Sequence, residues 1–258
     1  MPLSQQQTEE IRVILTGMIR RKLASGKKKP SVMPFQVRLL GKDRVALFSF
    51  IHSISTSLGQ DFFESTAKTV ARPHFARVLM QYNLGKAISS DAQRVIQTLI
   101  DALANGRTIP NKANEVRQVL AAAQSGTTEE TETPLVDLFL ESYEGDEYYI
   151  ELKTVKPNKG DFKDFKKTLL DWTAIRGKAN PKAKIHTLLA LAYNPYEPKP
   201  YQWMTSAKML DGKNDLLVAK DFWDFLGGEN TYEELLDVFE QVGIALRPEI
   251  DVRFANLT

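Results

Sequence analysis

Two neighbouring segments of this chain alternate between apolar and polar residues with a period of two, and a short turn separates them. Every even-numbered position of 136–140 and 148–152 is apolar, and the turn is Glu144-Gly145-Asp146. Such alternation places successive side chains on opposite faces of a strand, and two alternating runs around a glycine turn predict a β-hairpin. We expect the even-numbered side chains to face the core.

The odd-numbered positions of this hairpin carry charged side chains: Asp137, Glu141, Glu147, Glu151 and Lys153. If the loop is centred near Glu144, Asp137 lies opposite Glu151 with Cβ atoms about 5 Å apart, and Lys153 follows on the same face. Two opposed carboxylates repel each other, so the pair costs stability unless a cation lies between them. A divalent ion is the natural candidate.

Mg²⁺ suits this arrangement, because it prefers oxygen ligands and keeps several waters beside one or two carboxylates and substrate phosphates. A neighbouring lysine can position the attacking water or stabilise charge on the phosphorane, and a bound metal lowers the pKa of the water. The pattern therefore favours phosphodiester hydrolysis. The alternative is an acidic outer face on which Lys153 only pairs with Glu151.

Several classes of site are excluded by composition. The chain has no cysteine, so it has no disulfide, thiolate zinc site or cysteine nucleophile, and its three histidines form no HExxH pattern. None of the five Gly-Lys dipeptides is followed by Ser or Thr, which excludes a P-loop and disfavours a motor-coupled enzyme.

The longest uncharged run, residues 45–60, is shorter than the roughly 20 apolar residues of a membrane span. The first residues show no basic region followed by an apolar one, so we expect a cytoplasmic protein.

Charges are sorted into blocks along the chain. Residues 1–44 hold ten Lys or Arg against three acids, residues 118–152 hold nine acids and no base, and residues 153–188 hold ten bases and three acids. Basic runs also occur as solvated helix faces, but a basic block directly after an acidic one favours a polyanion together with a metal.

The remaining pattern predicts an α/β fold, with a mixed central β-sheet flanked by helices and a helical N-terminal half. We expect one nuclease domain over 1–258, in which 1–125 is mainly helical and 126–258 holds the catalytic sheet and the C-terminal helices. Spacing and capping signals predict helices at 6–24, 43–70, 73–84, 90–104, 112–124, 161–175, 216–226 and 231–242. Strands are predicted at 135–142, 147–155 and 184–193.

The pattern acid-x-Lys occurs five times, but only Glu151-Leu-Lys153 lies in a strand-like run that follows another strand with a proline-led acid, Pro134-Leu-Val-Asp137. Together these segments resemble the two half-motifs of the PD-(D/E)XK nuclease superfamily. In that superfamily the proline directly precedes the acid, whereas here it lies three residues before Asp137, which leaves Glu141 as the alternative first acid.

Residues 34–40 and 50–64 are similar to the amino-terminal block of type II restriction endonucleases of the TdeIII type. The resemblance implies that Asp137, Glu151 and the Leu152 carbonyl bind Mg²⁺ and that Lys153 assists the water. It also implies a glutamate from an amino-terminal helix beside the metal. Glu64 fits that position, and the alternative is a solvated helix acid.

A basic helix after the motif has a predicted role of its own. Lys156 and Lys159 would lie at its amino-terminal end, with Lys163, Lys166 and Lys167 along its exposed side, where each contact to a phosphate releases a counterion. Base reading needs forked or amide side chains, for which the following segment offers Arg176, Asn180, Asn194 and Gln202.

We therefore predict a Mg²⁺-dependent type II restriction endonuclease that cuts double-stranded DNA at a short palindromic site. The resemblance suggests a GGNCC-like target. A homodimer would match the palindrome, and the host should carry a cognate DNA methyltransferase. The alternatives are a PD-(D/E)XK nuclease of repair or junction resolution, and a non-catalytic DNA-binding protein on the same scaffold.

Overall fold

The computed structural model describes residues 3–24, 33–154, 161–202 and 206–255. Its helices are α1 (Gln5–Ala24), α2 (Pro34–Leu40), α3 (Lys42–Ser57), the π-helical turn η1 (Leu58–Phe62), α4 (Phe63–Ala71), α5 (Ser90–Ala104), α6 (Lys112–Ala122), α7 (Asp161–Ala179), α8 (Ser206–Met209), α9 (Lys220–Gly227) and α10 (Thr231–Ala255). Its strands are β1 (Arg77–Tyr82), β2 (Ala87–Ser89), β3 (Thr128–Glu130), β4 (Val136–Glu141), β5 (Asp146–Lys153), β6 (Lys184–Leu191) and β7 (Leu216–Val218).

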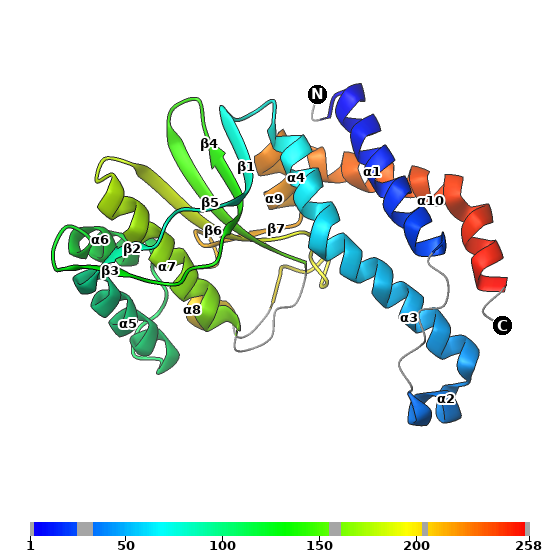
Figure 1. Ribbon diagram of the computed structural model, residues 1–258, viewed down its shortest axis with the longest axis horizontal. Helices are drawn as coiled ribbons and strands as arrows, with labels where there is room; N and C mark the ends of the chain where they lie inside the picture. The colour runs from blue at the N-terminus through cyan, green and yellow to red at the C-terminus, as the bar shows by residue number, and fades with distance from the viewer. Residues whose placement is uncertain (1–2, 25–32, 155–160, 203–205, 256–258) are drawn as a thin grey trace.

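Five strands form one mixed sheet in the order β1-β4-β5-β6-β7, which confirms the predicted fold class (Figure 1). The pairs β1–β4 and β4–β5 are antiparallel, whereas the pairs β5–β6 and β6–β7 are parallel. The β4–β5 hairpin has the predicted register, because Leu138 pairs with Ile150 and Glu141 pairs with Glu147. One further step in this register places Asp137 opposite Glu151.

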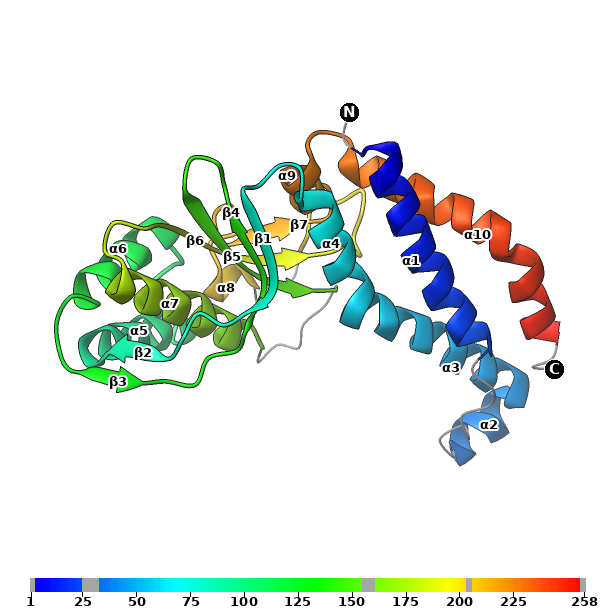
Figure 2. The same ribbon diagram turned by 45° about the horizontal axis from the view of Figure 1, so that its top comes forward.

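Helices cover both faces of the sheet, so that odd-numbered side chains of the hairpin face a core as well as the even-numbered ones. Leu138 and Ile150 belong to the core against α1, α4, α9 and α10, whereas Phe139 and Tyr149 belong to a second core against α5, α6 and α7 (Figure 2). The helix α7 connects the parallel strands β5 and β6, and such a crossover has to pack on one sheet face. Charged side chains of the hairpin are therefore confined to the strand ends.

Two of the predicted helices are wrong in part or in full. Residues 77–82 of the predicted helix 73–84 form the edge strand β1, and residues 216–218 of the predicted helix 216–226 form β7. A short apolar run does not distinguish a strand from a helix, and here pairing with β4 and β6 decides the conformation. The sequence also did not reveal α2, β2 and β3.

The helices α3 and α4 are joined by η1, so that residues 42–71 form one nearly continuous helical rod. Gly59 lies in this π-helical turn, where an added Cβ would come within 2.5 Å of a side-chain carbon of Thr154. The missing side chain therefore lets the rod approach the end of β5. Single π-helical turns of this kind are frequent at functional sites. No helix among the described residues has an apolar stretch long enough to cross a membrane.

A buried cluster of two bases and two acids fixes α7 against its neighbours. Lys166 is fully buried, which corrects the prediction of an exposed side chain, and its Nζ lies 2.5 Å from Oδ2 of Asp215 and in contact with Glu115. Lys112 Nζ lies 2.7 Å from Oδ1 of Asp215. Burial lowers the pKa of Lys112, whereas the pKa of Asp215 is lowered because its two lysine partners outweigh burial.

We predict that Asp215→Ala destabilises the protein by about 3–5 kcal/mol, because it leaves two lysines in a buried site without their shared carboxylate. Equilibrium urea unfolding measures this loss. Glu9→Ala is the control, since Glu9 forms an exposed pair with Arg12 and should change stability by less than about 1 kcal/mol. Equal effects of the two substitutions would contradict the assignment of the cluster as a structural anchor.

Candidate active site

Asp137, Glu151 and Lys153 converge at one end of the β4–β5 hairpin. The Nζ atom of Lys153 lies 2.6 Å from Oε1 of Glu151 and 3.5 Å from Oδ2 of Asp137. The backbone N–H of Leu152 donates to the same Oδ2 atom at 2.9 Å. The structure thus brings together the two acids and the amine that the sequence pattern singled out.

This group of side chains is open on the lysine side. The side chains of Asp137 and Glu151 are 14% and 9% exposed, whereas that of Lys153 is 36% exposed. The carboxylates are therefore shielded from bulk water while the amine remains accessible. A phosphodiester that approaches the end of the hairpin meets the ammonium group first.

The pKa values of Glu151 and Lys153 are both raised, for different reasons. Burial raises the pKa of Glu151, and the nearby carboxylate of Asp137 raises it further, so that the pairing with Lys153 does not restore the ordinary value. Burial alone would lower the pKa of Lys153, but Glu151 and Asp137 outweigh it and the net shift is upward. The upward shift keeps Lys153 a protonated cation at neutral pH. The upward shift at Glu151 means that its surroundings do not fully compensate the ionised form of this carboxylate.

The donor set fits a hard divalent cation. Oε2 of Glu151 is buried and has no hydrogen-bond partner, which leaves an acceptor that a cation could use. Carboxylate and carbonyl oxygens are the ligands that Mg²⁺ prefers, and it completes its shell with water and substrate. Within the described ranges no three acidic or histidine side chains form a ready-made metal cluster. The residues therefore suit a cation that is held by few protein ligands and completes its shell with water and substrate. Binding of the cation by the Leu152 carbonyl stays a prediction.

Glu64 reaches this site from the first turn of α4. Its Oε2 atom accepts a hydrogen bond from Nε2 of Gln81 at 3.1 Å, and the same nitrogen donates to Oδ1 of Asp137 at 3.2 Å. Glu64 also contributes to the raised pKa of Glu151. The predicted helical glutamate is thus placed beside the two strand acids.

Gln81 was missed by the sequence analysis, because residues 73–84 were assigned to a helix and no motif includes this residue. Only its place in β1 reveals it, between Met80 and Tyr82, which pair with Leu138 and Val136 on either side of Asp137. Glu141, the alternative first acid, is excluded from the site. It lies at the far end of β4, where its carboxylate pairs with Arg77 at 2.8 Å.

The predicted DNA-contacting residues have different positions. Lys163 is exposed on the first turn of α7, and this end of the helix adjoins the site, since Lys153 Nζ lies 5.8 Å from the ring centre of Phe165. Lys156 and Lys159 lie outside the described residues. Arg176 forms two hydrogen bonds with Glu147 at 2.5 and 2.6 Å, at the opposite end of β5.

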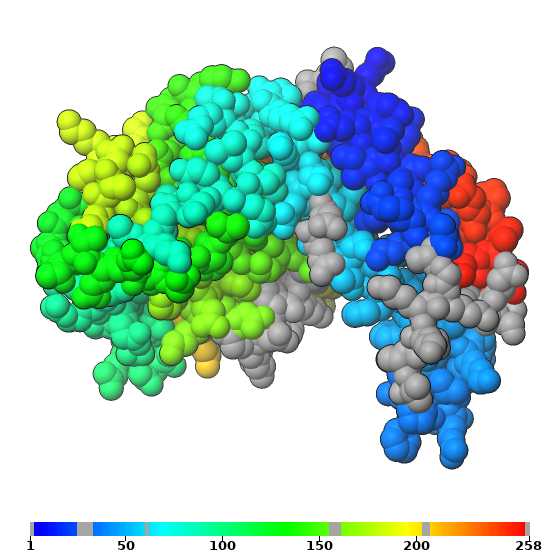
Figure 3. All heavy atoms as spheres, in the orientation of Figure 1, coloured from blue at the N-terminus to red at the C-terminus, as the bar shows by residue number. Residues whose placement is uncertain are grey.

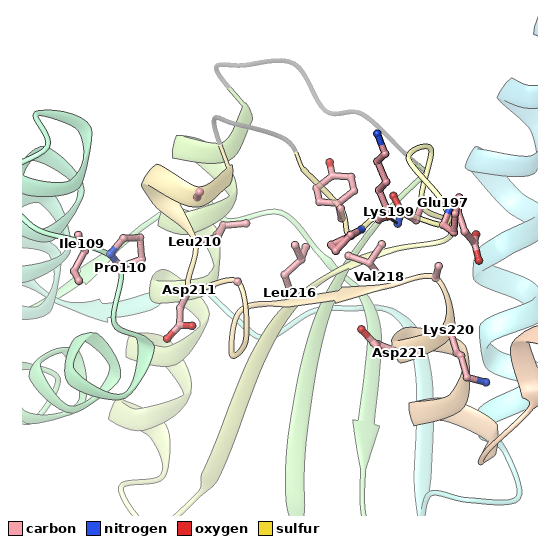
Figure 4. A pocket seen from close by; sticks show the side chains of 17 residues that line it. Ile109, Pro110, Glu197, Lys199, Leu210, Asp211, Leu216, Val218, Lys220 and Asp221 are labelled. Carbon is pink, nitrogen blue, oxygen red and sulfur yellow. Dashed lines mark hydrogen bonds between the residues drawn. The ribbon is translucent and has the colours of Figure 1, made fainter.

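A separate cavity of about 720 Å³ lies beside the edge strand β7. Its lining includes the segment after β6, with Lys199 and Glu197, and the residues around β7 (Figure 4). Asn194, a candidate for base reading, uses its side chain to close this segment, because Nδ2 donates to the carbonyl of Lys199 and Oδ1 accepts from the N–H of Tyr196. Neither Asp137 nor Glu151 lines this cavity.

Comparison with known proteins agrees with this geometry. A family model described as type II restriction endonuclease, HinfI, matches residues 3–243. The type II restriction enzyme HgiEI of Herpetosiphon aurantiacus is 30% identical over 233 residues, which cover 88% of this chain and 83% of that protein. HgiCII of the same organism, also a type II restriction enzyme, is 29% identical over 232 residues, with coverage of 88% and 84%.

The type II restriction enzyme MjaII of Methanocaldococcus jannaschii is 26% identical over 223 residues, or 81% of this chain and 58% of that protein. The predicted resemblance to type II restriction endonucleases is thereby confirmed, and the narrower likeness to the TdeIII type stays a prediction. Because the family model spans nearly the whole chain, this protein belongs to the HinfI family of type II restriction endonucleases, which cleave DNA at specific sites.

Proposed function

We propose that the chain hydrolyses phosphodiester bonds of double-stranded DNA with Mg²⁺ held by Asp137, Glu151 and the Leu152 carbonyl. The observation that carries this proposal is the convergence of a buried acid, Glu151, and a half-buried acid, Asp137, on one lysine at an accessible strand end, with one carboxylate oxygen of Glu151 lacking a partner. A bound Mg²⁺ would supply a water of lowered pKa and would offset the negative charge of the phosphate.

The protein residues divide the remaining work. Lys153 is held as a cation by its two carboxylate partners, so its ammonium group can orient the attacking water and stabilise the charge that develops on the phosphate. The N–H of Leu152 fixes one oxygen of Asp137. Lys163, which is exposed on the first turn of α7, would bind a backbone phosphate next to the cut. Lys156 and Lys159 precede it in the sequence, and we propose the same role for them.

The proposal also includes the target site, the location of the enzyme in the cell and the host methyltransferase. GGNCC is the first target to test. We expect the enzyme to act in the cytoplasm of a host whose cognate methyltransferase modifies the same site. Contact of Arg176 with DNA stays a prediction, because its guanidinium group is paired with Glu147.

A homodimer would place one site on each strand of a palindrome. Supporting this proposal, α2 and the adjoining part of α3 project from the rest of the molecule (Figure 3). These two helices carry six exposed apolar side chains: Phe35, Leu39, Leu40, Leu47, Phe48 and Ile51. Together they expose on the order of 700 Å², judged from the size of such side chains. That is close to the ~800 Å² that each partner buries in a standard interface. We propose that a second copy of the chain covers this surface.

Lys153→Ala should slow cleavage of plasmid DNA by about 10²–10³-fold, because the cation that stabilises the developing charge is removed. Wild-type enzyme with Mg²⁺ should give discrete bands, and the variant should still bind DNA in gel-shift assays with Ca²⁺. Lys213→Ala is the matched control, since Lys213 belongs to an acid-x-Lys sequence outside the site. Cleavage by Lys153→Ala at the wild-type rate would contradict the proposed role.

Glu151→Gln should raise the thermal unfolding midpoint of the metal-free protein by a few degrees, because it removes a buried charge next to Asp137. The pKa of Glu151 is raised in the folded state, so its ionised form destabilises the fold at neutral pH and this penalty is relieved as the pH falls. The difference between variant and wild type should therefore shrink on acidification. Differential scanning calorimetry in EDTA tests this, and a lower midpoint for the variant would refute it.

Phe35→Asp combined with Leu39→Asp should convert a dimer into a monomer in sedimentation velocity experiments, because both side chains are more than 80% exposed on α2. Ile109→Asp is the control, since Ile109 is equally exposed but lies in the α5–α6 loop. A monomeric wild type, or a dimer that persists in the double variant, would exclude this surface as the interface.

A further inference from the structure

Gln81 interrupts its own strand with a left-handed backbone. Its φ is +48°, and among the described non-glycine residues only Ala219 and Asn230 also have positive φ. On either side of it, Met80 pairs with Leu138 and Tyr82 pairs with Val136, while Gln81 itself is left out of the ladder opposite Asp137. A non-glycine residue in this conformation is strained, so the surrounding structure has to hold it there.

The strained backbone directs an amide between two acids from different elements. Nε2 of Gln81 donates to Oε2 of Glu64 in α4 at 3.1 Å and to Oδ1 of Asp137 in β4 at 3.2 Å. The other oxygen of Asp137 is held by the N–H of Leu152. Each oxygen of the first strand acid thus accepts from a neutral donor, although Oδ2 also faces Lys153 Nζ at 3.5 Å. The donor to Oδ1 also holds the helical glutamate.

Position 81 requires a hydrogen-bond donor that carries no charge. Glu64, Asp137 and Glu151 lie close enough for their charges to interact, and their mutual repulsion would drive them apart. A lysine at position 81 would neutralise the field that attracts a cation, and a glutamate would add to the repulsion. The amide of glutamine stabilises both carboxylates through charge-assisted hydrogen bonds and leaves their net charge unchanged.

We propose that Gln81 is a positioning residue for the cleavage site, which orients Glu64 and Asp137 toward the divalent cation and thereby recruits the α4 glutamate to the reaction. This inference rests on the proposed Mg²⁺-dependent function. This positioning role would account for the strain at Gln81, which the surrounding structure has to hold in place.

Gln81→Gly and Gln81→Asn test this role against a purely structural one. Glycine and asparagine adopt positive φ more readily than glutamine, so a residue needed only for the chain turn would be replaced by either without loss. The positioning role predicts the opposite result. Removal of the amide should weaken the response to metal by about 10–100-fold, and asparagine, one methylene shorter, should not bridge both acids.

The readouts are the Mn²⁺ concentration that half-saturates the shift in thermal unfolding, measured without DNA, and the kcat and KM for cleavage. We expect the Mn²⁺ midpoint to rise in both variants and kcat to fall while KM for DNA stays nearly constant. Asn230→Gly is the matched control, because it relieves a positive φ between α9 and α10 and should leave both readouts unchanged.

Epistasis with the glutamate provides a second test. In a Glu64→Ala background, the effect of Gln81→Gly should be several-fold smaller than in the wild type, because the acceptor on the α4 side of the bridge is already removed. If the wild type responds to Mn²⁺ and both Gln81 variants respond equally well, the inference is wrong while the proposed function stands. If the wild type shows neither a metal response nor cleavage, the proposed function itself fails.

Discussion

The repulsion between Asp137 and Glu151, opposed across β4 and β5, is the constraint on which the site depends. Two carboxylates at neighbouring strand positions are unfavourable in a shielded environment, and the protein offsets them only in part with Lys153. The raised pKa of Glu151 and its unpartnered oxygen are the remaining imbalance. This imbalance is the reason for which we propose that the site holds a cation.

Elements from the first third of the chain complete this end of the sheet. The helical rod of α3, η1 and α4 approaches β5 through Gly59, and the edge strand β1 inserts Gln81 between Glu64 and Asp137. The two hydrogen bonds of Gln81 join it to residues that lie 17 and 56 positions away in the chain. The catalytic sheet is therefore built from both halves of the protein, and the mainly helical first half also supplies an edge of the active site.

A different use of charge anchors α7 against its neighbours. Around Lys166, two bases balance two acids inside the core, so that α7 is anchored with little net field. At the hairpin end the acids outnumber the bases and the lysine remains accessible. Both arrangements contain lysine–carboxylate pairs, and they differ in the balance of charges and in the access of the lysine to solvent.

The sequence by itself determined the β4–β5 hairpin, its register and the three residues that meet at its end, because a period of two around a short turn fixes which side chains oppose each other. It could not determine the conformation of residues 77–82 or 216–218, since short apolar runs become strands only when a neighbour pairs with them. It also misjudged Lys166, whose burial depends on acids contributed by α6 and the segment before β7. Gln81 was decided entirely by the tertiary structure, because its role arises from a strained backbone and from two partners that no local pattern connects.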